Sequence, residues 1–283
     1  MQENRSNNLG ILFTDDAGNG LTQDFFASII NSFKCYVEKK GYNVVFINCT
    51  DEGQEMCSMV AQCKKLDLEG IFVACTHIED PRVKELLDLD IPVVSVDLEM
   101  DRDKSVCISS DNVNGVHNLV DYIVSKGHTK IAYIHSESGN IVTQIRKKAF
   151  FEAIEKNGIE IPAEYICEGK FRDMDKASYF TDKLLQLPNP PTCIIYSDDF
   201  AAIGGLNTAH ARGLEVPRDV AIAGYDGIRV AMQYEPRLTT VRQRSDKMGE
   251  VCGKMLLEII QNDSNITDKL ILIDTDLEKG RTV

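Results

Sequence analysis

The sequence predicts an α/β protein built from two doubly wound parallel sheets. Short apolar runs rich in β-branched residues alternate with longer segments whose apolar residues recur three and four positions apart. Such alternation is typical of parallel strands connected by helices that cover both faces of the sheet. A chain of 283 residues is long enough for two units of this kind.

The strands are expected in two groups of four. In chain order they cover residues 9–14, 43–48, 70–74 and 93–96, then 130–135, 165–168, 193–196 and 220–224. Residues 105–111 are expected to link the two groups. Each group runs strand, helix, strand in the same order, without a sharp sequence repeat, so two similar lobes are the natural interpretation.

The helices are expected between these strands, at residues 22–40, 80–87, 112–126, 146–157, 175–187 and 200–212. Each of four predicted helices is followed by a glycine, at residues 41, 127, 158 and 213. The residue after a helix often has a left-handed backbone conformation, which glycine adopts most easily. A last helix at 246–261 and a short strand at 270–273 form the tail of the chain.

Composition excludes several classes of protein. The 31 Lys and Arg against 44 Asp and Glu give a net charge of −13, which argues against a broad basic surface for nucleic acid. No apolar run approaches the roughly 20 residues of a membrane span, and the polar start does not resemble a signal peptide. The nine cysteines are odd in number and contain no Cys-x-x-Cys, so we expect reduced thiols and a cytoplasmic protein.

Acidic and aromatic residues stand at the expected ligand-binding edges. In open parallel sheets, ligands bind at the carboxyl ends of the strands. The acidic residues at these ends include Asp16, Asp97, Asp198 and Asp226, and the aromatic residues nearby include Phe25, Phe26 and Phe171. Carboxylates accept hydrogen bonds from hydroxyls and aromatic rings pack against sugar rings, so a hydroxyl-rich ligand is expected. An Asp at a strand-to-helix junction can instead be a helix cap, an alternative that stays open for Asp16.

Arg146 could add a fork of hydrogen-bond donors in the second lobe. The sequence offers no complete dinucleotide fingerprint, no phosphate loop and no nucleophile elbow. The histidines show no metal-ligand spacing. We therefore expect no enzyme, no catalytic residue, no cofactor and no metal.

Seven segments of the sequence form a specific set of motifs, in a fixed order and spacing. They are Ser110-Asp111-Asn112-x-x-Gly115, residues 126–134, Arg146 with Phe150 and Ala153, Ser197-Asp198-Asp199-x-Ala201-Ala202, residues 213–220, Gly224-Tyr225-Asp226-Gly227 and residues 236–243. Together they resemble the LacI/GalR family of transcriptional regulators, and the resemblance runs from about residue 8 to the C-terminus.

The resemblance implies a periplasmic-binding-protein-like fold of type I, with two lobes joined by three crossovers. The first lobe would comprise residues 8–109 and 242–270, and the second residues 110–241 and 271–283. It also implies a homodimer and a small-molecule effector, expected to be a carbohydrate, in the cleft between the lobes. By motif, it places Arg146, Asp226, Asp198 and Phe171 at the effector, and more weakly Asp97, Phe25 and Phe26.

The family's N-terminal helix-turn-helix has no counterpart in these residues. We therefore expect an effector-binding domain whose contact with operator DNA belongs to that absent part. Two other functions stay open. One is a sugar-binding solute receptor of an ABC importer, which would share the fold, and the other is a doubly wound enzyme that uses the Asp cluster. The identity of the effector is also open.

Overall fold

The chain folds into two compact α/β units. A computed structural model describes residues 6–14, 20–47, 58–262 and 268–283. One unit comprises Met1–Ser110 and Arg244–Ile273, and the other comprises Asp111–Gln243 and Asp274–Val283. The chain therefore passes from one unit to the other at three points, after residues 110, 243 and 273.

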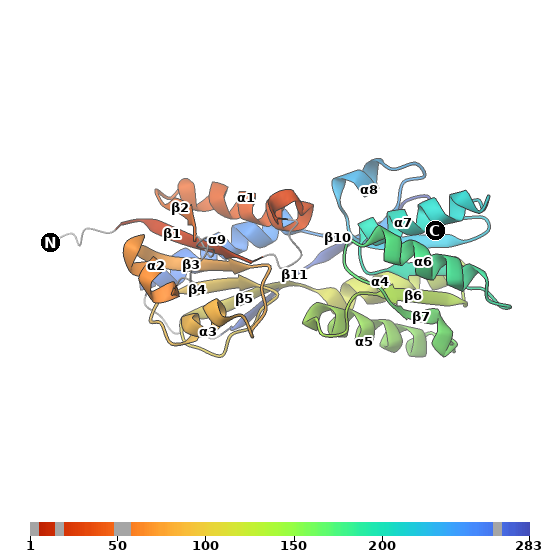
Figure 1. The fold of residues 1–283 in the computed structure, drawn as a ribbon, viewed down its shortest axis with the longest axis horizontal. Helices are drawn as coiled ribbons and strands as arrows, with labels where there is room; N and C mark the ends of the chain where they lie inside the picture. Colours follow the sequence, from red (N-terminus) through yellow and green to blue (C-terminus); the bar gives the residue numbers. More distant parts are fainter. Residues whose placement is uncertain (1–5, 15–19, 48–57, 263–267) are drawn as a thin grey trace, which may run out of the picture. The chain divides into compact units, whose positions relative to one another are not determined.

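The first unit contains a six-stranded parallel sheet (Figure 1). Its strands are β1 (Asn8–Phe13), β2 (Asn43–Phe46), β3 (Leu68–Ala74), β4 (Val93–Val96), β5 (Ser105–Ser110) and β11 (Leu270–Ile273). They lie in the order β11-β5-β4-β3-β1-β2, and every neighbouring pair is parallel. All carboxyl ends therefore meet at one edge of the sheet.

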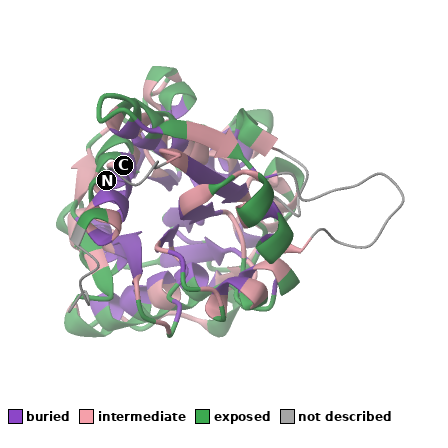
Figure 2. Cartoon of the chain, turned by 90° about the vertical axis from the view of Figure 1, so that its left-hand side faces the viewer, coloured by how far each residue is buried: buried purple, intermediate pink, exposed green. Residues whose placement is uncertain are grey.

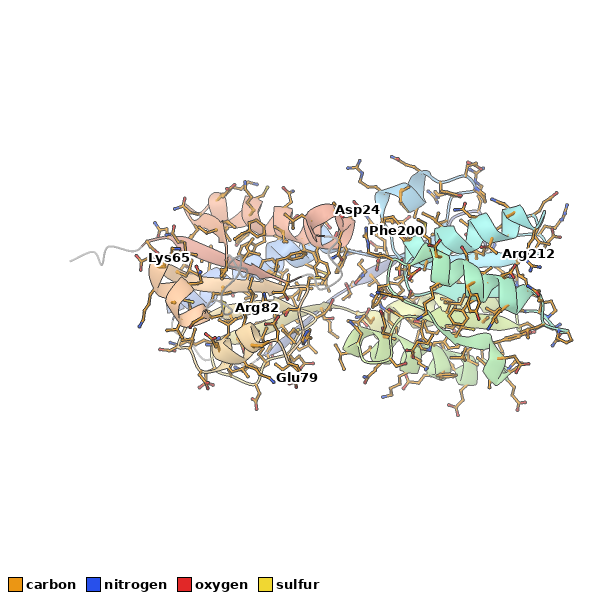
Figure 3. All side chains as sticks on the ribbon, in the orientation of Figure 1. Asp24, Lys65, Glu79, Arg82, Phe200 and Arg212 are labelled. Atoms are coloured by element: carbon orange, nitrogen blue, oxygen red, sulfur yellow. The ribbon has the colours of Figure 1, made fainter. Side chains whose placement is uncertain are left out.

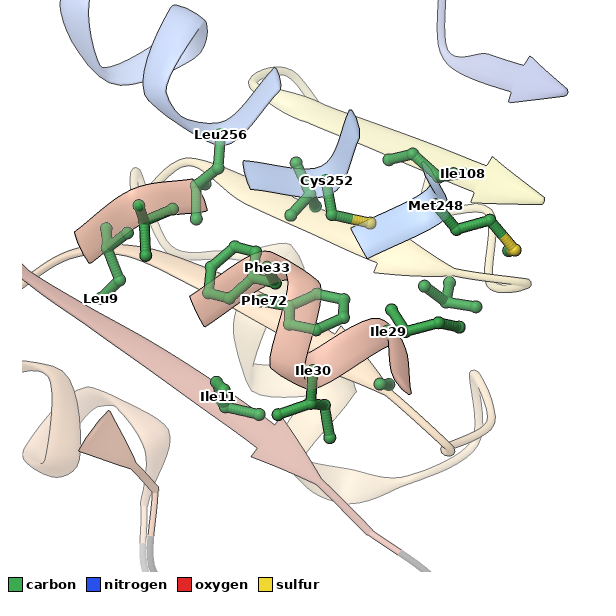
Figure 4. Packing of buried hydrophobic residues seen from close by; sticks show 14 of the residues in the cluster. Leu9, Ile11, Ile29, Ile30, Phe33, Phe72, Ile108, Met248, Cys252 and Leu256 are labelled. Atoms are coloured by element: carbon green, nitrogen blue, oxygen red, sulfur yellow. The ribbon is translucent and has the colours of Figure 1, made fainter. Parts of the chain in front are cut away.

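Two pairs of helices cover the two faces of this sheet. On one face lie α1 (Asp24–Glu38) and α9 (Ser245–Asn262), and on the other lie α2 (Met59–Lys65) and α3 (Pro81–Leu87). Figure 4 shows Phe33 of α1 and Cys252 of α9 packed on the first face. Because side chains of a strand alternate between faces, Phe72 of β3 joins this cluster while Ile71 joins the opposite one.

The second unit repeats the plan with one reversed strand. Its sheet has the order β12-β10-β9-β8-β6-β7, with β12 antiparallel to β10 and all other neighbours parallel. The strands are β6 (Ile131–His135), β7 (Ile166–Glu168), β8 (Cys193–Tyr196), β9 (Ala221–Asp226), β10 (Thr239–Gln243) and β12 (Thr275–Glu278).

Four long helices cover the second sheet, and a short helix, α8 (Arg229–Gln233), follows β9. One face packs against α4 (Asn112–Ser125) and α5 (Ile141–Lys156), and the other against α6 (Met174–Leu185) and α7 (Asp199–Ala211). The strands are mostly buried while the outer helix faces are exposed, a contrast that Figure 2 shows in purple and green. None of the helices in the described ranges is long and apolar enough to cross a membrane.

The predicted fold class is confirmed, with corrections to individual elements. Residues 105–111 are not a link, because Ser105–Ser110 form the buried strand β5. Its three serines reduced the apolar signal of a strand. Each sheet has six strands rather than four, since β5, β10 and β12, together with the tail strand predicted at 270–273 and confirmed as β11, complete them. Helix α5 begins at Ile141, not at 146, because the side chain of Asn140 caps it by accepting from the amides of Val142 and Thr143.

Candidate functional site

Arg146 is a buried cation held in place from three sides. It lies on α5 with 4% of its surface exposed. Its Nε donates to Oδ1 of Asn112 (2.8 Å), and Nη1 donates to the carbonyl of Ser197 (3.2 Å). Its Cζ lies 3.6 Å from the centroid of the Tyr225 ring. These contacts fix the guanidinium plane, and within the described part of the chain no acceptor is bonded to Nη2.

Asp226 faces this guanidinium from the end of β9. Its Oδ1 lies 3.9 Å from Nη1 of Arg146 and accepts a hydrogen bond from Nε2 of Gln243 (2.7 Å). The backbone φ of Asp226 is +107°, a left-handed value that is uncommon for a residue other than glycine. Among the residues that the structure describes, none donates to the other carboxylate oxygen, Oδ2.

The carboxyl of Asp226 has a strongly raised pKa. Burial raises its pKa to about 7, and the nearby Asp198 adds to the rise. The Arg146 guanidinium, the Gln243 amide and Arg172 all oppose it. Because the pKa lies near physiological pH, Asp226 can accept a ligand hydrogen bond in one protonation state and donate one in the other.

Asp198 and Asp199 begin α7 and are both engaged within the protein. Asp198 is the N-cap, and it accepts from the amides of Ala201 (2.9 Å) and Arg172 (3.0 Å) and from the hydroxyl of Ser197 (3.0 Å). Asp199 accepts from the amide of Ile228 (2.8 Å) and the hydroxyl of Thr240 (2.6 Å). Burial raises the pKa of both carboxyls, that of Asp199 well above its ordinary value.

Phe171 lies in the connection between β7 and α6, half-buried. The next residue, Arg172, has a φ of +58° and places its guanidinium 4.2 Å from the ring centroid of Phe200. Phe200 lies in the first turn of α7, and its position is labelled in Figure 3. The amide of Arg172 also donates to Asp198, so the Phe171 loop is fixed beside the start of α7.

The first unit carries its own set of predicted residues. Asp97 follows β4 with a φ of +56°, and its Oδ1 accepts from the Ser109 hydroxyl at 2.5 Å. Phe25 and Phe26 open α1 with their rings edge to face, 5.1 Å between centroids, and both are partly buried against the core. Asp16 lies outside the described residues.

The structure thus brings Arg146, Asp226 and Asp198 together at one edge of the second sheet. It also reveals two partners that the sequence analysis did not select. Asn112 and Gln243 hold the guanidinium and the carboxylate respectively, and both are buried. Gln243 ends β10, a strand missing from the prediction; with β10 included, the rule that ligands bind at strand ends would have pointed to it.

Comparison with known proteins agrees with this architecture. Residues 120–283 match the family model described as periplasmic binding protein-like domain. The HTH-type transcriptional repressor ExuR of Bacillus subtilis is 28% identical over 268 residues, which cover 94% of this chain and 78% of that protein. The repressor PurR of Vibrio parahaemolyticus is 27% identical, over 92% of this chain and 76% of its own length.

Two solved structures extend the comparison to the whole fold. A LacI transcriptional regulator from Bacillus cereus has a TM-score of 0.83 at 25% identity, and the match covers 98% of each chain. A complex of the transcriptional regulator CelR with cellobiose also has a TM-score of 0.83, at 20% identity, over 99% of this chain and 85% of the other.

Proposed function

The chain belongs to the periplasmic binding protein-like domain family of LacI-type transcriptional regulators, and we propose that Arg146 and Asp226 grip a hydroxyl-rich effector at the edge of its second sheet. One observation carries this proposal. Nη2 of Arg146 and Oδ2 of Asp226 have no partner in the described chain, while Nε, Nη1 and Oδ1 of the same groups are anchored. A ligand hydroxyl can accept from the first atom and donate to the second.

The ligand class follows from the same chemistry. A carboxylate accepts from two vicinal hydroxyls, a guanidinium donates to ring or hydroxyl oxygens, and the aromatic Phe171 can pack on the C–H face of a sugar ring. A regulator with a similar fold was solved with cellobiose, which supports a carbohydrate. We assign Asp198 to orienting the Phe171 loop, because its oxygens accept three hydrogen bonds from the protein.

We propose further that Asp16, Asp97, Phe25 and Phe26 of the first unit contribute secondary contacts. Bound effector would then change the affinity of a homodimeric regulator for operator DNA. The repressor names of the relatives ExuR and PurR support the DNA partner. They also support a regulatory rather than a catalytic role. Sedimentation equilibrium of this chain tests the homodimer, since a single species of monomer mass would contradict it.

A thermal-shift screen tests the proposed function. The panel contains cellobiose, D-ribose, D-glucose, D-galactose, glucose 6-phosphate, adenine and guanine. A compound present at a hundred times its Kd stabilises the folded state by about 2.7 kcal/mol, which raises Tm by about 5 °C or more in a protein of this size. We expect a carbohydrate to do so.

Two site variants and one control identify where that compound binds. Asp226→Ala and Arg146→Met should each abolish the rise in Tm. Arg212→Ala should preserve it, because Arg212 pairs with Asp182 on the outer surface of the same unit. A compound that stabilises the two site variants as much as the original chain would show that it binds elsewhere. If no panel member raises Tm, a carbohydrate or purine effector is contradicted.

A further inference from the structure

Both groups of the proposed site are attached to residues that border the chain crossings. The second unit begins at Asp111, and Asn112 is the first residue of α4. The unit's long segment ends at Gln243, the last residue of β10. Arg146 donates to Asn112, and Asp226 accepts from Gln243. Each site group is thus one hydrogen bond away from a point where the chain leaves the unit.

The bond between Arg146 and Asn112 is well enclosed. Asn112 is 3% exposed, and the same Oδ1 that accepts from Nε of Arg146 lies 3.3 Å from the Tyr225 hydroxyl. The preceding residue, Asp111, caps α4 by accepting from the amide of Asn114 at 3.0 Å. The chain crossing after residue 110 therefore enters a capped helix whose first side chain holds the guanidinium.

The hydrogen bond between Asp226 and Gln243 lies next to two of the three crossings. Gln243 is 6% exposed and precedes Arg244, which belongs to the first unit. In the antiparallel pair of β10 and β12, Gln243 lies opposite Thr275. Thr275 is two residues past the third crossing, after Ile273. The side-chain amide of Gln243 thus connects the Asp226 carboxylate to the paired strands β10 and β12, which lie next to the second and third crossings.

We propose that Asn112 and Gln243 are positioning residues that couple the hydrogen-bonding state of Arg146 and Asp226 to the backbone at the crossings. The proposal rests on the proposed function, because it gives the effector site a route for regulation. A ligand hydroxyl that binds the Asp226 carboxylate changes the charge on Oδ1, the atom that accepts the hydrogen bond from Gln243. The Gln243 side chain then changes its position. Because Gln243 is the last residue of β10, this movement displaces the backbone at the second crossing.

Ionisation of Asp226 provides a test that needs no effector. It changes the charge on the atom that Gln243 contacts. The Asp226 carboxyl carbon and the backbone amides of Gln243, Arg244 and Thr275 are followed by NMR between pH 5 and 9. We expect these amide shifts to titrate with the midpoint of Asp226, and Asp226→Asn to remove the component with that midpoint, which separates it from the titration of Asp199 beside Thr240 of the same strand. Amides that do not follow Asp226 in the unaltered chain would overturn the proposal.

A variant then separates coupling from mere proximity. Gln243→Met keeps the length of the side chain and removes its donor. The Asp226 midpoint should rise by about one pH unit, because a hydrogen bond to the charged form is lost. The response at Arg244 should fall at least threefold. Gln144→Met, a matched change at an exposed position on α5, should leave both measurements unchanged. An unaltered response of Arg244 in Gln243→Met would overturn the assigned route.

The Asn112 half has its own readout. The Nε proton of Arg146 should exchange slowly with solvent, and Asn112→Leu should accelerate that exchange at least tenfold. Asn112→Asp keeps the acceptor and should restore slow exchange, which a purely packing role would not predict. Equal exchange in Asn112→Leu and the unaltered chain would overturn this half. None of these measurements uses a panel compound, so their failure is distinct from a failure of the ligand screen.

Discussion

Arg146 lies over the ring of Tyr225, with its Cζ 3.6 Å from the ring centroid. Tyr225 immediately precedes Asp226 in β9, so one strand end supplies both the ring beneath the guanidinium and the carboxylate beside it. A guanidinium over an aromatic face is stabilised by the ring quadrupole, and more strongly when both are removed from water. Because Arg146 and Tyr225 are both buried, the ring contributes to holding a charge that burial alone would disfavour.

The contribution of the ring can be separated from that of its hydroxyl. Tyr225→Phe keeps the ring and removes the hydroxyl, which contacts Asn112 at 3.3 Å, and it should lower the free energy of unfolding by about 1 kcal/mol. Tyr225→Leu also removes the ring and leaves a void, and it should lower that free energy by about 3 kcal/mol. Urea denaturation measures both. Equal losses in the two variants would show that the ring adds nothing beyond its hydroxyl.

The carboxyl of Asp226 should make stability decrease as pH rises. Burial raises its pKa to about 7 from the ordinary 3.8, so the folded state binds a proton that the unfolded state has released. Its stabilising contribution is complete below pH 3.8 and is lost as pH rises through 7. Subtracting the unfolding free energies of Asp226→Asn from those of the unaltered chain gives this contribution together with its coupling to Asp199, whose pKa the Asp226 charge also raises. A flat difference between pH 4 and 8 would contradict the raised pKa.

Asp80 in the first unit should show the opposite dependence on pH. Burial would raise its pKa, but hydrogen bonds from the Arg82 side chain and amide outweigh burial and lower the pKa to about 2. Arg82 donates from Nε at 2.8 Å and from Nη2 at 2.5 Å, and its position is labelled in Figure 3. The contribution of the ionised Asp80 is therefore present above pH 3.8 and is lost as pH falls through 2.

Asp80→Asn tests this assignment, because Asn keeps the cap of α3 and loses the charge. The variant should be less stable by about 2 kcal/mol at pH 7 and should match the unaltered chain near pH 2. Thermal unfolding across this range gives the comparison. A constant difference at all pH values would indicate that the substitution disturbs packing instead of removing a charge.

Periodicity revealed the fold because most strands are apolar throughout. The four residues of β8 (Cys193–Tyr196) are all buried, and such runs stand out in a sequence. In contrast, β12 (Thr275–Glu278) is an edge strand that pairs only with β10, and it is half-buried along its length. Its residues therefore show no apolar pattern. Strands of this kind owe their structure to the neighbouring strand, which local sequence does not encode.

The candidate site was only partly accessible from sequence for a related reason. Arg146 and Asp226 could be chosen because charged residues next to buried strands and helices are conspicuous. Their partners are neutral amides, and Gln243, although it ends one of the seven family-like segments, carries no charge that would mark it as a site residue. Its role depends on the distance between the ends of β9 and β10, which is a property of the sheet.

The last prediction concerns Gly205, which lies inside α7 against the ring of Tyr196. A Cβ added at Gly205 would lie 2.0 Å from the hydroxyl oxygen of Tyr196 and 2.3 Å from its Cζ. Tyr196 is 1% exposed and its hydroxyl lies 2.7 Å from Oγ1 of the buried Thr181, so the ring has no room to yield. Alanine favours a helix over glycine by about 1 kcal/mol, but overpacking a dense core costs about 1–3 kcal/mol.

We therefore expect Gly205→Ala to be destabilising, by up to about 2 kcal/mol, despite its better helix propensity. Gly139→Ala, in the turn before α5, is the control for an added Cβ that meets no heavy atom within 4 Å, and it should change stability by less than about 0.5 kcal/mol. Urea denaturation measures the free energy of unfolding of both variants. If Gly205→Ala were as stable as the unaltered chain or more so, the contact between α7 and Tyr196 would have to be looser than the structure shows.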